Sequence, residues 1–232
     1  MQEEGGKDMI VNGIPASKWG ASLSEKLITP SGVNATMQDG IPSSKDSSCK
    51  RIYIKVLFEN STRDLVEKSI SNFSAIVSKT FILQVPNKDT YFKCEPAPLK
   101  IEETGFNDMM YITAEFNCIE YEKEKLITNS EKSFSFEVSG NIKAPAIVEI
   151  IPDVTVNKLV ITGLGEEITI NNVVGGKRTI INSEEGTVTQ DGINHYEHYE
   201  SWDFPYVSAG SNTVKVNIIG VTVNIKYKAR WN

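Results

Sequence analysis

The second half of the chain consists of short runs in which apolar and polar residues alternate, and this pattern limits the possible folds more than any other. Alternation with a period of two is typical of a β-strand that has one buried face. Gly or Asn turns separate the runs, and no helical periodicity interrupts them. The pattern predicts a β-sandwich of the jelly-roll type built from AIVEII, VTVNKLVIT, EEITINNVV, KRTIINS, GTVTQ, NTVKVNII and VTVNIKYK.

The last two of these runs lie between Gly210 and Asn232. We expect them to form adjacent strands that turn over at Gly220, with the residues GSN forming the turn into the first strand. Trp231 would then pack either against this sheet or against the first half of the chain. The sequence leaves that choice open.

The first half of the chain combines strands with a single helix. The run RIYIKVLF places four apolar residues on one face of a strand, namely Ile52, Ile54, Val56 and Phe58. In the next segment apolar residues recur at spacings of four, three and four, which is one stripe of an α-helix, at Val66, Ile70, Phe73 and Val77. Ser61, three residues before Asp64, indicates the start of the helix in the manner of a capping box.

Further strands complete this first module. The dipeptide Asn12-Gly13 indicates a hairpin turn, FILQV and TYFKC are separated by the turn PNKD, and MMYITAEFNCIEYE alternates with its apolar residues inward. These strands predict an α+β module with one helix laid on a sheet. The Gly and Ala-Pro-Ala residues near 140 indicate a junction, so we place the domains at 1–139 and 140–232. Segment 29–50 is dense in Gly, Pro, Ser and Asp, which favours a long loop or arm.

Charge and cysteine content exclude several classes of protein. The net charge is −6, and no basic stripe suited to a phosphate backbone is present. No stretch has the roughly 18 uninterrupted apolar residues of a membrane span. The acidic opening MQEEGGKDMI does not resemble a classical export signal, so we expect synthesis and folding in a cytoplasm. The three cysteines, Cys49, Cys94 and Cys118, are far apart in the sequence, and we expect reduced thiols without a disulfide framework or a zinc site.

The segment DGINHYEHYESWD contains the chain's two histidines, His195 and His198, among several acidic residues. On an extended segment these two side chains would face opposite sides, so they would converge on a metal only in a helix or tight turn. A solvated loop is the preferred interpretation, and we expect no metal or cofactor. Aromatic side chains on a sandwich loop can also stack on sugar rings, which makes four residues candidate glycan contacts, Tyr196, Tyr199, Trp202 and Tyr206.

No catalytic motif is visible in the sequence. The segment ITGLGEE lacks the third glycine of a dinucleotide-binding fingerprint, and no G-x-S-x-G elbow is present. Neither histidine has a cysteine or serine partner that the sequence identifies. We therefore expect a protein that is not an enzyme, and keep a glycosidase on a β scaffold only as a minor alternative.

Taken in order, these segments resemble the distal tail protein (Dit) family of long-tailed phages that infect Gram-positive bacteria. The resemblance covers nearly the whole chain from about residue 9. It rests on IVNGI, the helix STRDLVEKSISNFSAIV, the junction GNIKAPAIVEI, and the later segments LVITGLGEEITINN, RTIINSEEGTVTQDGIN, FPYVSAGSNTVKV and YKARWN.

The resemblance implies a ring-forming N-terminal module followed by a galectin-like β-sandwich. It implies a virion structural protein at the tail tip of a siphovirus or prophage, synthesised in the host bacterial cytoplasm. Copies of the protein would form a homo-hexameric ring, single or stacked. This ring would join the tail tube protein to the tail-associated lysin or other tail-tip proteins of the baseplate. The segment 29–50 would serve as an arm in the ring. We expect no sequence-specific nucleic acid and no membrane among its partners. The alternative is an adhesin that binds host cell-wall glycan through the sandwich.

Overall fold

The computed structural model describes residues 8–30, 37–38, 41–42 and 49–232. Contacts divide the chain after Glu122, and the second compact unit runs from Lys123 to Trp231. Each unit has its own hydrophobic core. The predicted fold class, an α+β unit followed by a β-sandwich, is confirmed.

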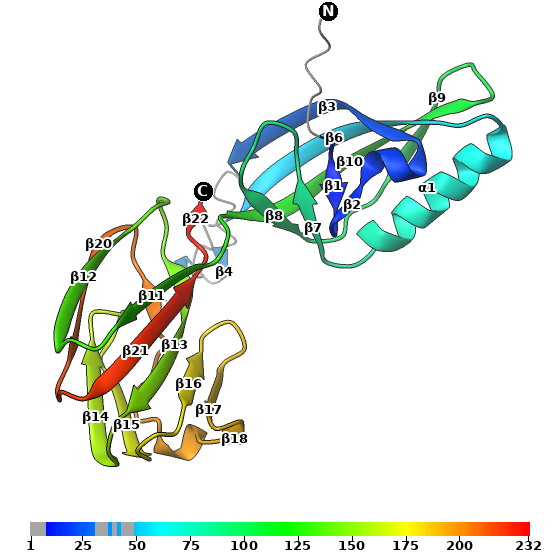
Figure 1. Ribbon diagram of the computed structural model, residues 1–232. Coiled ribbons are helices and arrows are strands. Elements are labelled where there is room, and N and C mark those ends of the chain that lie inside the picture. Colours follow the sequence, from blue (N-terminus) through cyan, green and yellow to red (C-terminus); the bar gives the residue numbers. More distant parts are fainter. Residues whose placement is uncertain (1–7, 31–36, 39–40, 43–48) are drawn as a thin grey trace, which may run out of the picture. The chain divides into compact units, whose positions relative to one another are not determined.

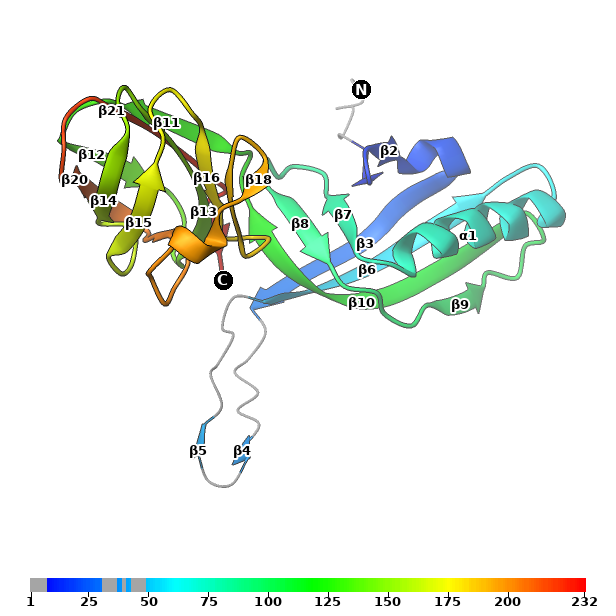
Figure 2. The same ribbon diagram turned by 90° about the horizontal axis from the view of Figure 1, so that it is seen from below.

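The first unit is a curved antiparallel sheet with one helix across it (Figures 1 and 2). The strand order is β2-β1-β7-β8-β10-β6-β3, and β9 pairs with β10 beyond the end of β8. The elements are β1 (Ile10–Val11), β2 (Ile14–Pro15), η1 (Ala16–Trp19), β3 (Ala21–Pro30), β6 (Lys50–Glu59), α1 (Arg63–Val77), β7 (Phe81–Gln84), β8 (Tyr91–Cys94), β9 (Lys100–Glu103) and β10 (Met109–Tyr121).

The helix packs on the sheet through the stripe that the sequence predicts. Val66, Ile70, Phe73 and Val77 are the buried residues of α1. The ring of Phe73 meets the ring of Phe58 on β6 edge to face, with the centroids 5.4 Å apart. The predicted cap is wrong by one residue, because the hydroxyl of Thr62 and not that of Ser61 accepts the hydrogen bond from the backbone N–H of Leu65.

The first hairpin forms at Asn12-Gly13, as predicted. Val11 pairs with Ile14, and both turn residues have positive φ angles, 49° and 79°. Asn12 also joins this hairpin to the sheet, since its backbone N–H donates to the carbonyl oxygen of Ile82 and its side-chain oxygen accepts from the N–H of Ile82.

Only part of the predicted arm at 29–50 lies in the described residues. β3 extends to Pro30 and β6 begins at Lys50, so both ends of the segment are sheet strands. Between them, β4 (Met37–Gln38) and β5 (Ile41–Pro42) pair antiparallel. Residues 31–36, 39–40 and 43–48 lie outside the described part.

The prediction of reduced thiols without a disulfide is wrong for two of the three cysteines. Cys94 on β8 and Cys118 on β10 are joined by a disulfide. They lie 24 residues apart in the sequence, yet the antiparallel register places them directly opposite each other. Spacing along the chain therefore misled the prediction, because strand register decides which cysteines meet.

The second unit is a sandwich of two antiparallel sheets (Figure 1). One sheet has the order β11-β21-β13-β16-β17-β18, with β19 also on β13, and the other has the order β12-β20-β14-β15. The elements are β11 (Lys125–Asn129), β12 (Ser133–Val138), β13 (Ala144–Pro152), β14 (Val156–Thr162), β15 (Ile168–Val173), β16 (Thr179–Asn182), β17 (Thr187–Gln190), β18 (Ile193–Asn194), η2 (Tyr196–His198), β19 (Tyr206–Val207), β20 (Gly210–Val216), β21 (Val221–Tyr227) and β22 (Arg230–Trp231).

The boundary between the units lies upstream of the predicted division at 139/140. β11 pairs with β21 and β12 pairs with β20, so residues 125–138 belong to the two sheets of the sandwich. The sequence near 140 contains turn residues, but these connect two strands of the same unit.

The last two long strands are not neighbours, which corrects the prediction for the end of the chain. β20 pairs with β12 and β14, whereas β21 pairs with β11 and β13. The turn at Gly220 therefore crosses from one sheet to the other. Gly210 to Asn212 begin β20 itself and do not form a turn before it. Trp231 packs against the core of the second unit.

Candidate functional site

The four predicted aromatic contacts divide into exposed and structural residues. Trp202 is 96% exposed and Tyr196 is 48% exposed, so both present ring surface to solvent. Tyr199 is buried, and its hydroxyl donates to the carbonyl oxygen of Asp203 at 2.6 Å. Burial raises the pKa of Tyr199 to about 12.

The rings around Tyr199 form a small cluster at the surface of the sandwich. Tyr199 stacks on Phe204 with centroids 5.5 Å apart, and Tyr196 lies 6.1 Å from Tyr199. Tyr206 has a different environment, because the Lys143 ammonium lies 5.0 Å from the centre of its ring and the ring covers Gly165 closely. The structure thus gives Tyr199 and Tyr206 packing roles and leaves Tyr196 and Trp202 accessible.

The two histidines lie together, contrary to the expectation for an extended segment. Residues Tyr196–His198 form the 3-10 helix η2, which brings the rings of His195 and His198 to a centroid distance of 4.3 Å. His195 Nε2 lies 3.2 Å from the carbonyl oxygen of Asn171, and His198 Nε2 lies 3.5 Å from a carboxylate oxygen of Glu197. Within the described part of the chain, no group of three or more His, Cys, Asp or Glu side chains is arranged to hold a metal ion.

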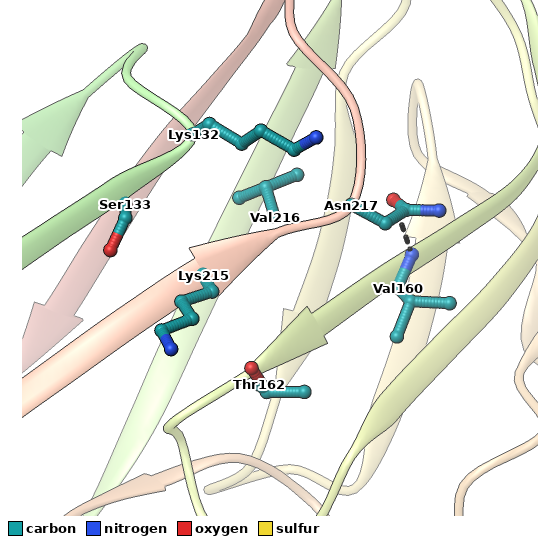
Figure 3. Close-up of a pocket in the computed structure, with 7 residues that line it drawn as sticks. All are labelled: Lys132, Ser133, Val160, Thr162, Lys215, Val216 and Asn217. Carbon is teal, nitrogen blue, oxygen red and sulfur yellow. Dashed lines mark hydrogen bonds between the residues drawn. The ribbon is translucent and has the colours of Figure 1, made fainter.

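A pocket of about 370 Å³ opens on the outward face of the smaller sheet (Figure 3). Lys215 on β20 is flanked there by Ser133 on β12 and Thr162 on β14, its partners in the strand register. The ammonium groups of Lys132 and Lys215 point in different directions, so they do not form a joint anion site (Figure 3). The lining residues are Lys132, Ser133, Val160, Thr162, Lys215, Val216 and Asn217.

A buried carboxylate marks the end of the sheet in the first unit. Glu120 on β10 is 3% exposed, and it accepts hydrogen bonds from Lys50 at 2.5 Å, from Lys88 at 2.8 Å and from Thr90 at 2.6 Å. Burial opposes ionisation of Glu120, but these three hydrogen bonds outweigh it and hold the pKa of the carboxyl below its ordinary value. This cluster was not predicted from the sequence, although Glu120 continues the inward positions of its strand after Cys118.

The edge of the first sheet is the other feature that was not predicted. β3 is ten residues long and ends the strand order, so one of its edges is unpaired within the described residues. The strand is largely exposed, and Leu27 on it is 60% exposed. A register shift between Leu23 and Glu25 interrupts the alternation, which explains why the pattern gave no clear strand there.

The sheet face that does not carry the helix has paired charges. Arg51 lies 3.6 Å from Glu115, and Glu102 lies 3.8 Å from Lys55 and 3.0 Å from Lys100. The Lys55 ammonium also lies over the Tyr111 ring. No helix among the described residues is long and apolar enough to cross a membrane.

Known proteins resemble this chain in both sequence and fold. Residues 139–231 match the family of the siphovirus-type tail component, C-terminal domain. No curated protein matches the chain by sequence.

Two solved structures were matched to this chain. One is a crystal structure of the SPP1 Dit protein, described as a paradigm of the hub adsorption apparatus in Gram-positive-infecting phages. Its TM-score is 0.71 at 9% identity, with 97% of this chain and 99% of that chain covered. The other is a chain of the phage P2 baseplate in its activated conformation with Ca, with a TM-score of 0.47 at 12% identity, covering 93% of this chain and 92% of that chain. At these identities the first likeness establishes the fold.

Proposed function

We propose that this chain, whose residues 139–231 match the siphovirus-type tail component, C-terminal domain, is a hub that assembles into a ring at the tail tip. As such a hub it would be a structural component of a phage tail, located in the virion. In this proposal six copies form the ring, which joins the tail tube protein to the tail-tip proteins or the tail-associated lysin. Its task is mechanical and not enzymatic.

The free edge of β3 is the observation that carries the proposal. An edge strand exposes a row of backbone N–H and C=O groups that can pair with another chain. β3 offers ten residues for such pairing, whereas β2, at the opposite end of the strand order, has two. We place the contacts between copies in the first unit, at this edge.

The charges of the first sheet fit a conduit for DNA. Phosphate groups bind where Lys or Arg side chains are free to neutralise them. On the face without the helix, Arg51, Lys55 and Lys100 are held by the carboxylates of Glu115 and Glu102. DNA that passes such a face would find these cations already neutralised.

Native mass spectrometry of the full chain tests this proposal. We expect an assembly of six copies of the 25.7 kDa chain, or a stack of two such rings. Leu27→Lys places a charge on the β3 edge and should shift the assembly to monomers, because edge charges oppose strand pairing. Leu126→Lys is the matched control, since Leu126 is also an exposed leucine on an edge strand, β11, but lies in the second unit.

Two results would contradict the ring. One is a wild-type chain that stays monomeric at every concentration, even with the tail tube protein present. The other is an equal effect of both lysine substitutions, which would move the contacts away from β3. Circular dichroism should show that both variants remain folded.

A narrower proposal concerns the aromatic loop of the second unit. We propose that Trp202 and Tyr196 contact a sugar ring if this loop meets cell-wall glycan, because they are the exposed members of the predicted set. Titration with cell-wall polysaccharide should then change the fluorescence of the wild-type chain, and Trp202→Ala should remove that response. Ile193→Ala, at a residue 72% exposed, is the control. A response that persists in Trp202→Ala would exclude this contact.

A further inference from the structure

We propose that the bond between Cys94 and Cys118 is a covalent latch on the β7–β8 hairpin, and that it is made and broken only when this hairpin opens. The hairpin comprises β7, the turn at residues 85–90 and β8. The inference concerns the redox behaviour of the first unit and does not depend on ring formation.

The two sulfur atoms are inaccessible in the folded chain. Cys94 is 0% exposed and Cys118 is 1% exposed, and both belong to the hydrophobic core of the first unit. Phe92 and Phe116, which precede them by two positions on the same faces of their strands, are also fully buried. Thiol–disulfide exchange requires a thiolate to reach a sulfur atom in line, so a reagent in solution cannot react with this closed structure.

The hairpin is the part of the structure whose movement would expose both sulfur atoms. β7 and β8 have four residues each, and on its other side β7 is held by two residue pairs with β1 and by two hydrogen bonds between Ile82 and Asn12. β10, in contrast, is paired with β6 over ten residues. Local opening is easiest where few bonds must break, so the hairpin should detach from β10 before β10 leaves β6.

Side-chain hydrogen bonds to Glu120 also hold the same hairpin against β10. The turn residues Lys88 and Thr90 both hydrogen-bond to Oε1 of Glu120 on β10, at 2.8 Å and 2.6 Å. Glu120 pairs with Phe92, two positions along the strands from the disulfide. Lys26 of β3 also donates a hydrogen bond to the carbonyl oxygen of Pro86 in this turn. The Glu120 contacts therefore contribute to how often the hairpin opens, and the disulfide determines whether it can separate from β10 once open.

The chemistry of the latch is a thiol–disulfide exchange. To close it, the thiolate of one cysteine attacks a low-molecular-weight disulfide such as oxidised glutathione, and one glutathione thiolate leaves. The second cysteine thiolate then attacks the mixed disulfide, forms the Cys94–Cys118 bond and releases the second glutathione thiolate. Two protons are lost from the cysteine thiols, and the glutathione disulfide is reduced.

The test follows the reduction of the folded full-length chain by dithiothreitol. Samples are quenched, unfolded and alkylated, and mass spectrometry then counts reactive thiols. The oxidised chain should show one, Cys49, and the reduced chain all three cysteines. In the native wild type the reaction should be slow, and urea below the unfolding midpoint should accelerate it.

Variants test whether opening of the hairpin limits the rate of reduction. Lys88→Ala combined with Thr90→Val removes both turn contacts and should accelerate native reduction about tenfold or more, because each such hydrogen bond stabilises the closed state. Lys93→Ala is the control, since Lys93 is exposed on β8 and its substitution removes the same charge without touching Glu120. Its rate should equal that of the wild type.

Three results would overturn the inference. They are three alkylated thiols after oxidation, native reduction of the wild type as fast as that of the urea-unfolded chain, and equal rates for the double variant and Lys93→Ala. If the double variant does not fold, the urea dependence of the wild type decides the question. Ring formation is tested separately by native mass spectrometry, so the proposed ring and the proposed redox behaviour of the hairpin can fail independently of each other.

Discussion

Glu120→Gln is expected to lower the free energy of unfolding of the first unit by about 3 kcal/mol, because it removes one partner of a buried ion cluster. The side chain of Lys50 is only 13% exposed, so its ammonium group would be left largely buried without its carboxylate. Lys88 would lose the same partner. The glutamine amide keeps the size of the side chain, which leaves charge as the main change.

The effect of this substitution should depend on pH. The pKa of Glu120 in the folded chain is below its ordinary value, since the hydrogen bonds from Lys50, Lys88 and Thr90 outweigh burial. The ion cluster therefore stabilises the fold above the unfolded-state pKa, and this contribution is lost as the pH falls through the lower folded-state pKa. The difference between wild type and Glu120→Gln should accordingly shrink below about pH 4.

Hydrogen exchange of peptides from β8 and β10, measured as a function of denaturant concentration and pH, tests both the stability loss and its pH dependence. Glu115→Gln is the matched control on the same strand. Glu115 forms an exposed pair with Arg51, and exposed pairs contribute at most about 1 kcal/mol. Similar losses for the two substitutions, or a loss for Glu120→Gln that does not change in acid, would show that the cluster is not the source of the stability.

Gly163→Ala is expected to destabilise the second unit by about 4 kcal/mol, through backbone strain and a backbone collision together. Gly163 has a φ of 95°, and a Cβ atom there would stand 1.9 Å from the carbonyl oxygen of Thr213. Thr213 lies on β20, which is held between β12 and β14. β20 cannot move aside without disturbing pairing in the smaller sheet.

The control separates the collision from the strain. Gly210 has a φ of 88°, and no heavy atom lies within 4 Å of the point that a Cβ atom would occupy there. Gly210→Ala should therefore cost only the strain of a positive φ, about 1 to 2 kcal/mol. Thermal unfolding and hydrogen exchange of the second unit compare the two variants. Equal losses would mean that β20 yields to the new methyl group.

The helix and the two central strands of the first unit were predictable because their patterns are local. The stripe from Val66 to Val77 and the alternation from Ile52 to Phe58 each specify a buried face by themselves. The helix start was less certain, since Ser61 and Thr62 offer equivalent hydroxyl groups and backbone geometry selects one of them.

The sequence predicted which residues belong to the candidate site but not how they are arranged. The sequence identified the aromatic loop, but it did not separate the exposed Trp202 from the buried Tyr199, because both lie on one irregular segment. The proximity of His195 and His198 required the 3-10 helix between them. Glu120 was a detectable signal, being an acidic residue at an inward position, but its partners come from separate parts of the chain.

The sequence by itself determined which residues of each strand and of the helix face a core, because the polarity of each side chain follows directly from its residue type. Only the tertiary structure decided which strands are neighbours. It separated β20 from β21, moved β11 and β12 into the sandwich, and set Cys94 opposite Cys118. The physical reason is that strands are joined by backbone N–H and C=O groups that nearly all residues share, so partner and register follow from how whole sheets pack.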